Sequence, residues 1–547
     1  LLYQLRIARG TLALSILPFT CAAAQRAEVS LSLFLLFSPW AYYPPSVILA
    51  AYCRVSFVQN RRAIQRQKRQ HGCQEPPKYP HRDRIFGSDL FRDNAENSKK
   101  LRLLDTWTDR YKKYGTTFTA IFQGTRAICT VDPTNLHAIT TINFKDYGVQ
   151  PMRRAATLPF LGEGIFTMDG AFWEHSRALI RPTFSKTNIA NLAAFEINLQ
   201  KFWDLLPKDG STVDLKPLLC RLFIDTSTQF LFGESMNILD VKEPQRSQEF
   251  LDAFHYAQQG TGKRLQLGKL AFLYYDKKYY ESIKLAHAFA DYYVDKAIEY
   301  RRRHLGVKDV KVDSLRDDDA PERNIVLLHE MAMETDNRKD LRNQIMHVFL
   351  AGHESSAITI GNAIFQLSRH PDKWEKLRAE VRSLGDAPLT LDRLRSLKYI
   401  SNVIKETVRL YPVASMSTRM AYKDTFLPTG GGPAKTSPVF VHKGTIIMSS
   451  VFELHRIGEC WKPDPEAFRP ERWEGDFQPG PNYMPFGWGI RMCPARNLAE
   501  IEIGYTLARM AEKYEKIECR DEVVEWVEEM RVSTSSRNGT KVGLIAV

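Results

Sequence analysis

Apolar and polar positions follow two different periods along the chain. Short alternating runs, typical of strands, occur early and again late, whereas the middle carries apolar residues at helical spacing. The predicted strands are Thr116–Phe122, Arg126–Val131, Val439–Val441 and Thr445–Met448. The predicted helices are Lys284–Arg303, Leu341–Ser368 and Tyr399–Tyr411. This mixture predicts a mainly helical α+β domain with small β-sheets.

A long uncharged stretch lies near the start of the chain. Val29–Cys53 holds 25 residues without a charged side chain, and about 20 apolar residues cross a bilayer core. The basic residues Arg54, Arg61, Arg62, Arg66, Lys68 and Arg69 follow at once. Positive charge beside an apolar span is retained on the cytoplasmic side. We therefore expect a membrane anchor over residues 29–58; a buried helical hairpin is the alternative, because prolines interrupt the run.

Three further boundaries follow from composition. Residues 1–28 form an N-terminal extension of uncertain status, either signal-like or upstream sequence. Residues 59–83 predict a basic linker, because prolines 76, 77 and 80 make Gln74–His81 semi-rigid. Residues 84–547 show no comparable break and predict one catalytic domain.

Composition and charge narrow the class of protein. The chain is 44% apolar and 25% charged, as in ordinary globular proteins. Its net charge of +13 favours an anionic membrane surface or an acidic protein partner, because no zinc-finger or RNA-binding spacing accompanies it. The eight cysteines form no C-x-x-C pair, which indicates a reducing compartment and excludes a disulfide-stapled secreted domain.

One of these cysteines lies in a segment with chemistry of its own. Phe486, Gly489, Arg491 and Cys493 have the spacing F-x-x-G-x-R-x-C. A thiolate that binds haem iron needs a tight loop, a cation for a propionate and an apolar ring that limits solvent access. Gly489 permits the turn, Arg491 offers the cation and Phe486 offers the ring. The segment indicates Cys493 as a metal ligand; a buried structural cysteine is the alternative.

Through this loop the sequence resembles the cytochrome P450 family, the haem-thiolate monooxygenases. The resemblance covers nearly all of Gln74 to Val547 and is strongest to the fungal subfamily that hydroxylates n-alkanes and fatty acids. The residues that carry this second likeness are His71–Pro80, Leu427–Pro433 and Cys493–Ala495. Ala495 departs from the glycine that most of the family has there.

A second motif of the family is Glu406-Thr-Val-Arg409, with Arg472 downstream in Phe468–Trp473. Positions i and i+3 share a helix face, so the two charges of the motif can pair. A surface salt bridge is the usual meaning of such a pair. The resemblance implies instead a buried structural triad of Glu406, Arg409 and Arg472 behind the haem.

A third motif lies inside the long predicted helix, at Ala351–Ser356. The resemblance places an acid and an alcohol here, at a widened groove above the iron, and Glu354 and Ser355 match them. Such a pair at a helix distortion can relay protons to dioxygen through water. A polar patch tolerated within a helix is the alternative reading.

A fourth motif is Trp173-Glu-His-Ser-Arg177. The indole N–H and the guanidinium lie four residues apart on one helix face, and both can reach a haem propionate. Arg419 matches another propionate-binding arginine of the family. Either arginine could instead be a surface cation.

The resemblance implies a haem-dependent monooxygenase with haem as its cofactor. No dinucleotide-binding fingerprint or flavin domain is evident, so electrons are expected from an NADPH-dependent diflavin reductase, with cytochrome b5 as a second candidate donor. The expected location is the endoplasmic reticulum membrane, with the catalytic domain in the cytosol. Nucleic acid is not an expected partner.

The expected substrate is an apolar small molecule, a long-chain fatty acid or alkane hydroxylated at or near its end. The alternative is oxidative tailoring of a polyketide or other fungal secondary metabolite, because the chain reads His353-Glu-Ser-Ser where the alkane group commonly has Arg-Asp-Thr-Thr. A haem-thiolate isomerase or dehydratase and a non-catalytic membrane haem protein are the other classes. Candidate pocket walls are Val348, Phe349, Val413, Ala414, Met416 and Val532–Ser536.

Overall fold

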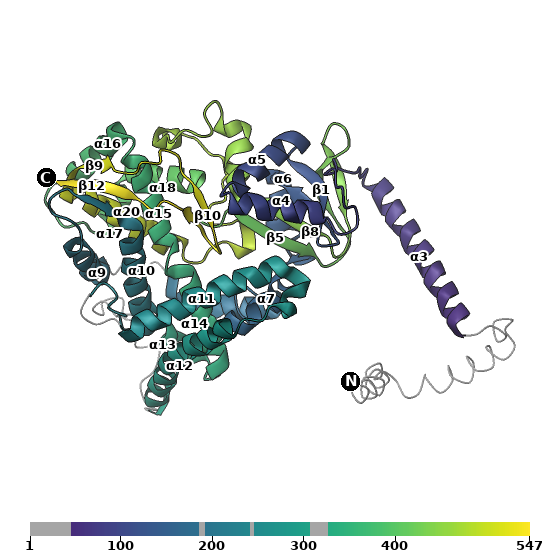
Figure 1. Ribbon diagram of the computed structural model, residues 1–547, viewed down its shortest axis with the longest axis horizontal. Helices are drawn as coiled ribbons and strands as arrows, with labels where there is room; N and C mark the ends of the chain where they lie inside the picture. The colour runs from purple at the N-terminus through teal and green to yellow at the C-terminus, as the bar shows by residue number, and fades with distance from the viewer. Residues whose placement is uncertain (1–44, 185–191, 241–244, 307–325) are drawn as a thin grey trace. The chain divides into compact units, whose positions relative to one another are not determined.

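The computed structural model describes residues 45–184, 192–240, 245–306 and 326–547 (Figure 1). The chain divides into two compact units, Leu1–Gly72 and Cys73–Val547. In the first unit the described part is the helix α3, Pro45–Gln70, whose last turn carries Lys68 and Arg69. Most of the apolar stretch predicted to anchor the chain lies outside the described residues. Within them, no helix combines the length and apolar character that crossing a membrane requires.

The main sheet of the second unit has five strands in the order β1-β2-β8-β5-β3. They are β1 Thr117–Phe122, β2 Thr125–Thr130, β8 Ile446–Ser450, β5 Met416–Ala421 and β3 Tyr147–Gly148. Strands β1 and β2 form an antiparallel hairpin in which Thr117 is paired with Thr130. Strand β8 joins β2 in parallel and β5 in antiparallel register. The predicted strands Thr116–Phe122, Arg126–Val131 and Thr445–Met448 are confirmed here as β1, β2 and β8. The predicted strand Val439–Val441 is confirmed in a smaller sheet, as part of β7 Ser437–Val441.

Three smaller sheets complete the β structure of the described residues. They are the three-stranded sheet of β4 Thr212–Asp214, β12 Lys541–Ala546 and β9 Tyr514–Cys519, and the pairs β6 Thr425–Gly431 with β7 Ser437–Val441 and β10 Glu528–Met530 with β11 Thr534–Ser536. The β10–β11 hairpin contributes to the site, because its turn carries Ser533, whose hydroxyl contacts Glu354. These small sheets lie within a mainly helical unit, as the sequence predicts.

Helices form most of the second unit. The N-terminal half holds α4 Ser88–Lys99, α5 Leu103–Tyr114, α6 Pro133–His137, α7 Gln150–Leu161, α8 Gly170–Ile180, α9 Leu192–Asp204, α10 Leu215–Phe232, α11 Gln245–Leu267 and α12 Lys277–Gly306. The C-terminal half holds α13 Leu327–Glu334, α14 Arg338–Gly352, α15 Ser355–Leu367, α16 Pro371–Arg382, α17 Leu391–Ser396, α18 Lys398–Leu410, α19 Val451–Ile457 and α20 Arg496–Lys513. In Figure 1, α11 to α14 lie together in the lower part of the second unit, while α15 and α20 lie above them in its left half.

The helix α15 lies in the middle of the largest hydrophobic core. Every residue from Ser356 to Leu367 is buried, and α15 packs against α10, α18 and α20. A helix that is mostly apolar around its circumference is expected to be enclosed in this way. A second core is formed mainly by α11, α12, α13 and α14. The two cores meet where α14 is followed by α15, which makes this junction the structural centre of the unit.

The long helix predicted over Leu341–Ser368 is two helices in the structure. The helix α14 ends at Gly352, and α15 begins at Ser355. Glu354 between them has φ −135° and ψ −16°, outside the α-helical region. The apolar period continues through the break, so the sequence pattern alone reads as one helix. The helix distortion expected from the acid and alcohol motif is present here.

The segment predicted as a linker is part of the folded unit from Cys73 onward, while residues 59–70 continue α3. The amide of Gln74 donates to the carbonyl of Pro438 at 2.9 Å, and that of Tyr79 donates to Thr119 on β1 at 2.8 Å. Strand β1 is an edge of the main sheet, and an edge leaves backbone groups to be satisfied. The Pro-containing segment satisfies them, so it lies against the sheet instead of bridging solvent.

Candidate functional site

The Cys493 loop is a tight turn followed by a helix. Gly487 and Gly489 have φ +75° and +68°, a region that side chains with a Cβ rarely adopt. A Cβ at Gly489 would also overlap the carbonyl oxygen of Thr140. The amide of Cys493 donates to the carbonyl of Phe486 at 2.9 Å, which closes the loop. Glycine is therefore required at position 489 both for its dihedral angle and for the close approach of the neighbouring segment.

Helix α20 begins at Arg496, three residues after Cys493. Its N-terminal end thus lies next to the sulfur, where the helix dipole favours negative charge. Ala495 has φ −90°, so the alanine that replaces the family's usual glycine fits this backbone without strain. Burial raises the pKa of the Cys493 thiol, while the Ala495 amide, Arg177 and Arg496 act in the opposite direction. A bound metal cation would complete the stabilisation of the thiolate.

Four arginines gather close to this loop. Arg153, Arg177, Arg419 and Arg491 come from α7, α8, β5 and the loop itself. Arg491 forms an ion pair with Asp169. Burial, together with Arg153 and Arg491, lowers the pKa of Arg419 to about 9. Burial also lowers the pKa of Arg491 to about 10, although Asp169 opposes this shift.

The positive charge of this cluster exceeds the negative charge of Asp169. Buried charges are costly unless they are paired. Haem carries two propionates, and Arg–carboxylate pairs are among the stronger hydrogen-bonded contacts in proteins. The sulfur of Cys493 and the surplus guanidinium groups therefore fit the iron and the propionates of haem.

Trp173 and Arg177 meet the cysteine loop from α8. The Arg491 guanidinium lies 4.6 Å from the centroid of the buried Trp173 ring, and that of Arg177 lies 5.7 Å from it. Arg177 Nη1 donates to the carbonyl of Met492 at 3.0 Å. The structure thus brings together the motif on α8 and the cysteine loop, which are more than three hundred residues apart in the sequence.

The acid and the alcohol at the helix break have different partners. Ser355 Oγ donates to the carbonyl of Ala351 at 2.8 Å. Glu354 Oε1 accepts from Ser533 Oγ at 2.5 Å and from Gln258 Nε2 at 3.4 Å. Burial acts to raise the pKa of Glu354, but His353 and the Ser533 hydrogen bond outweigh it, and the pKa is lowered. Glu354 is therefore ionised near neutral pH.

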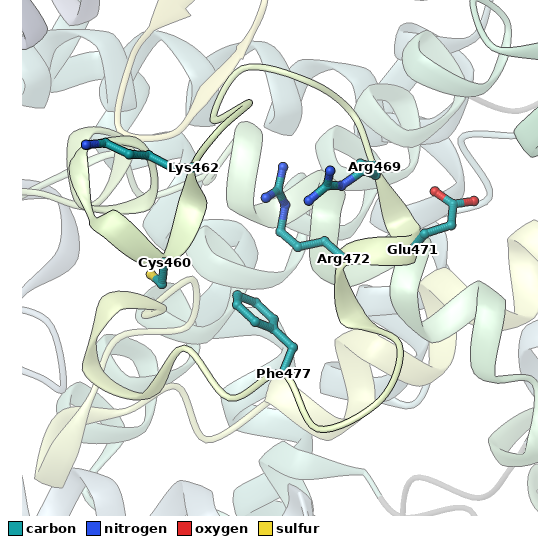
Figure 2. A pocket seen from close by; sticks show the side chains of 6 residues that line it. All are labelled: Cys460, Lys462, Arg469, Glu471, Arg472 and Phe477. Atoms are coloured by element: carbon teal, nitrogen blue, oxygen red, sulfur yellow. The ribbon is translucent and has the colours of Figure 1, made fainter.

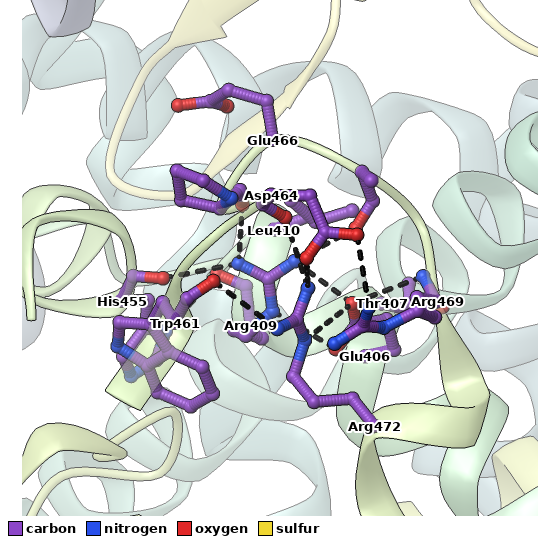
Figure 3. A network of polar contacts seen from close by, with 12 residues as sticks. Glu406, Thr407, Arg409, Leu410, His455, Trp461, Asp464, Glu466, Arg469 and Arg472 are labelled. Carbon is purple, nitrogen blue, oxygen red and sulfur yellow. Dashed lines mark hydrogen bonds and ion pairs between the residues drawn. The ribbon is translucent and has the colours of Figure 1, made fainter. Parts of the chain in front are cut away.

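The expected triad is a buried hydrogen-bonded network (Figure 3). Arg409 Nε and Nη2 donate to the two carboxylate oxygens of Glu406 at 2.9 and 2.8 Å. Arg472 Nε lies 3.4 Å from Glu406 Oε1, and Trp473 Nε1 donates to Oε2 at 2.9 Å. Glu406 and Arg409 are both 0% exposed. This network joins α18 to the segment around residues 455–473.

Arg409 also forms hydrogen bonds to the backbone of that segment. Its guanidinium donates to the carbonyls of His455, Pro465 and Ala467 at 3.1, 2.6 and 3.0 Å. Fork-shaped guanidinium groups suit several planar acceptors at once. The surface salt bridge considered from the sequence is thus a buried structural network.

A cavity of about 450 Å³ lies beside this network (Figure 2). It is lined by Cys460, Lys462, Arg469, Glu471, Arg472 and Phe477. Two of its cations already have partners, since Lys462 pairs with Glu459 at 2.8 Å and Arg469 with Asp464 at 3.1 Å. Its lining shares Arg472 with the triad and includes neither Cys493 nor Glu354. We therefore assign it no part in the chemistry.

The candidate pocket walls differ in how far they are buried. Phe349 is 1% exposed and packs edge-to-face against Phe254 and stacked on His353. It belongs to the core of α11, α12 and α14, so ordinary packing accounts for it. Ala414 is exposed, and Val532 is 48% exposed, so these two positions are open to contact.

Four residues of the site could not be identified from the sequence. Arg153, Asp169, Gln258 and Ser533 stand in no recognisable motif, and each reaches the site only through the fold. The one available signal is that Ser533 falls inside the loop proposed as a pocket wall. A charged or polar side chain gives no indication of its distant partners before the chain is folded.

Comparison with known proteins agrees with this geometry. A family model described as Cytochrome P450 matches residues 78–541. The chain is 36% identical to the cytochrome P450 monooxygenase apdE of Emericella nidulans, over 87% of this chain and 90% of that protein. It is 36% identical to himC of Aspergillus japonicus (92% and 90%) and to fsdH of Fusarium heterosporum (87% and 83%), both also named cytochrome P450 monooxygenases. The chain is thus similar to fungal monooxygenases over most of its length.

Proposed function

The chain belongs to the cytochrome P450 family, and from this premise we propose that it oxidises a fungal secondary metabolite, such as a polyketide, at a C–H bond. It is a haem monooxygenase. The names of the three relatives mention neither a fatty acid nor an alkane. The chain also reads His353-Glu-Ser-Ser where the alkane-hydroxylating group that it resembles commonly has Arg-Asp-Thr-Thr.

We assign the residues that hold the haem as follows. With haem bound, Cys493 would hold the iron through its sulfur, and Phe486 would limit solvent access to that sulfur. Arg177, Arg491, Arg419 and Trp173 bind the propionates, supported by their surplus positive charge beside Asp169. The bound haem supplies the redox chemistry that activates dioxygen, and the thiolate ligand favours O–O cleavage. Gly489 shapes the loop, and the triad of Glu406, Arg409 and Arg472 fixes the segment behind it.

Glu354 and Ser355 are assigned to proton delivery. The carboxylate of Glu354 is ionised in the folded protein, so it can accept a proton from solvent and release it at the helix break. The Ser355 hydroxyl is held by the carbonyl of Ala351, which leaves its oxygen free to accept a further hydrogen bond.

Glu354→Gln is expected to lower the product formation rate about a hundredfold, because an amide cannot carry the proton. Ser355→Ala should lower it as well and release more hydrogen peroxide per NADPH. The assay contains the holoenzyme, a diflavin reductase, NADPH and dioxygen. Glu299→Gln on the exposed part of α12 is the matched control and should leave the rate unchanged.

The same assay separates the function classes. Product that forms without NADPH and dioxygen would establish an isomerase or dehydratase instead. Binding spectra with fatty acids, alkanes and polyketides test the substrate class. If a fatty acid or an alkane bound tightly and changed the spin state while polyketides did not bind, the substrate would be a lipid and the proposal would be wrong.

An NADPH-dependent diflavin reductase, or cytochrome b5 for one of the electrons, is the proposed donor. The net charge of +13 supports docking to an acidic partner surface. Arg181 and Arg496 are exposed cations close to the Cys493 loop. They supply the local positive charge that such a partner would meet.

We also propose attachment to the endoplasmic reticulum membrane. Exposed apolar side chains gather between α11 and α12, where Leu270, Phe272, Leu273 and Tyr275 are 52%, 73%, 63% and 81% exposed. An apolar patch of this kind suits a membrane surface. The basic face of α3 supports contact with anionic lipid.

Phe272→Asp together with Leu273→Asp is expected to weaken binding to vesicles that contain phosphatidylserine, because two charges replace the inserted apolar groups. Flotation of the full chain with such vesicles measures the bound fraction. Lys277→Asp and Lys278→Asp, nearby on α12, separate loss of apolar contact from loss of positive charge. Unchanged flotation of the Phe272 and Leu273 variant would contradict membrane contact at this patch.

A further inference from the structure

The carboxylate of Glu354 is held from two sides of the helix break. Ser533 Oγ approaches from the turn of the β10–β11 hairpin, and Gln258 Nε2 approaches from α11. Both donate to the same oxygen, Oε1. The other oxygen, Oε2, lies 3.8 Å from His353 Nε2. The side chain is therefore oriented by residues that lie 96 and 179 positions away in the sequence.

The hairpin that carries Ser533 is itself anchored. Lys216 Nζ on α10 donates to Glu529 Oε2 at 2.9 Å, to Ser535 Oγ at 3.1 Å and to the carbonyl of Ser536 at 2.7 Å. The amide of Thr534 donates to the carbonyl of Val413 at 2.8 Å. A hydroxyl on such a fixed support meets its partner in one geometry.

The groups that face Glu354 come from four elements. His353 precedes it at the break, His255 lies on α11, and Cys220 lies on α10. Arg531 on the hairpin adds positive charge to the same region. Burial, with His353 and Arg531 acting in the same direction, lowers the pKa of His255 to about 4, so this imidazole is neutral near pH 7. Among the hydrogen-bond donors to the ionised carboxylate of Glu354, the Ser533 hydroxyl is therefore the nearer one.

His353 is oriented by its own backbone contact. Its Nδ1 lies 3.0 Å from the carbonyl of Phe349, an acceptor, so Nδ1 carries the proton. Its Nε2 is buried and has no hydrogen-bond partner among the described residues. At 3.8 Å from Glu354 Oε2, Nε2 lies beyond hydrogen-bond distance, so His353 acts on the carboxylate through charge and not as a hydrogen-bond donor.

We propose that Ser533 is a positioning residue for Glu354, with Gln258 as its weaker partner. Its hydroxyl fixes the carboxylate at the helix break and keeps it in the ionised form that accepts a proton. Because the two donors belong to the hairpin and to α11, proton delivery depends on the placement of these two elements. This inference rests on the proposed role of Glu354 in proton delivery.

An infrared titration of the holoenzyme tests the positioning without turnover. The protonated carboxyl band of Glu354 is assigned by its loss in Glu354→Gln and is followed against pH. Ser533→Ala is expected to move the midpoint of this band upward, because the carboxylate loses its shortest donor. Ser533→Thr keeps the hydroxyl and should restore the midpoint toward that of the unaltered enzyme.

Ser536→Ala is the matched control. Ser536 lies on the same hairpin and is buried, and its Oγ has no hydrogen-bond partner among the described residues. The same substitution there removes a hydroxyl without removing a bond to Glu354. A midpoint that is equal in Ser533→Ala and Ser536→Ala would overturn the proposal.

Two further measurements keep the test decisive. Gln258→Met removes the longer contact and should give a smaller upward shift; it replaces Ser533→Ala if that variant does not fold. In turnover, Ser533→Ala should release severalfold more hydrogen peroxide per NADPH, whereas Glu299→Gln on the exposed part of α12 should not. Normal turnover by Glu354→Gln would refute the proton role of Glu354 alone, while the infrared shift would still report whether Ser533 holds its carboxylate.

Discussion

Replacement of Cys493 by alanine is expected to abolish monooxygenase activity and the red-shifted Soret band of the ferrous carbon monoxide complex. Alanine provides no atom that can bind iron, and the thiolate is what favours O–O cleavage. The substitution leaves the loop intact, because the bond from the Cys493 amide to the Phe486 carbonyl involves only the backbone. The spectrum of the reduced enzyme under carbon monoxide measures this directly.

Cys460→Ala is the control for this experiment. Cys460 is likewise a free, partly buried cysteine, and burial raises the pKa of its thiol as it does for Cys493. Its replacement should leave the band and the activity unchanged. If the Cys493 variant kept a thiolate-type spectrum while a variant of another cysteine lost it, the assignment of Cys493 as the iron ligand would be wrong.

Arg409→Ala is expected to destabilise the fold by about 3–5 kcal/mol, because it leaves Glu406 buried without its bidentate partner. It also removes three hydrogen bonds to backbone carbonyls. A domain has only about 5–15 kcal/mol of stability, so we expect little haem-loaded protein. Urea unfolding of the holoenzyme, followed by circular dichroism and haem absorbance, gives the free energy of unfolding.

An exposed ion pair of similar chemistry provides the comparison. Lys277 and Glu281 lie 3.5 Å apart on α12, and their side chains are 81% and 60% exposed. Lys277→Ala should change the free energy of unfolding by less than about 1 kcal/mol. If Arg409→Ala were no more harmful than Lys277→Ala, the triad would have no structural role.

Strand and helix positions could be read from the sequence because they depend on local periodicity. The hairpin of β1 and β2 and the helix α18 appear where the apolar pattern places them. The break before Ser355 could not be read from periodicity, since apolar residues continue across it. It was expected instead from the cytochrome P450 resemblance, which places the acid and the alcohol at a widened groove.

The reaction class could be inferred before the fold was known, through the cytochrome P450 resemblance that the cysteine loop carries. The loop from Phe486 to Cys493 is a local structure, formed by glycine dihedral angles and one backbone hydrogen bond, so eight consecutive residues are enough to identify it. The Glu406 and Arg409 pair is local in the same sense, because residues three apart lie on the same face of a helix.

The partners of these local features depend on the folded chain. Asp169 reaches Arg491, and Ser533 reaches Glu354, across more than a hundred residues of chain. A polar side chain has many possible partners in a sequence, and packing selects one of them by bringing two distant elements within hydrogen-bond distance. The orientation of the acid at the helix break is therefore a property of the folded hairpin and α11, not of the motif that contains it.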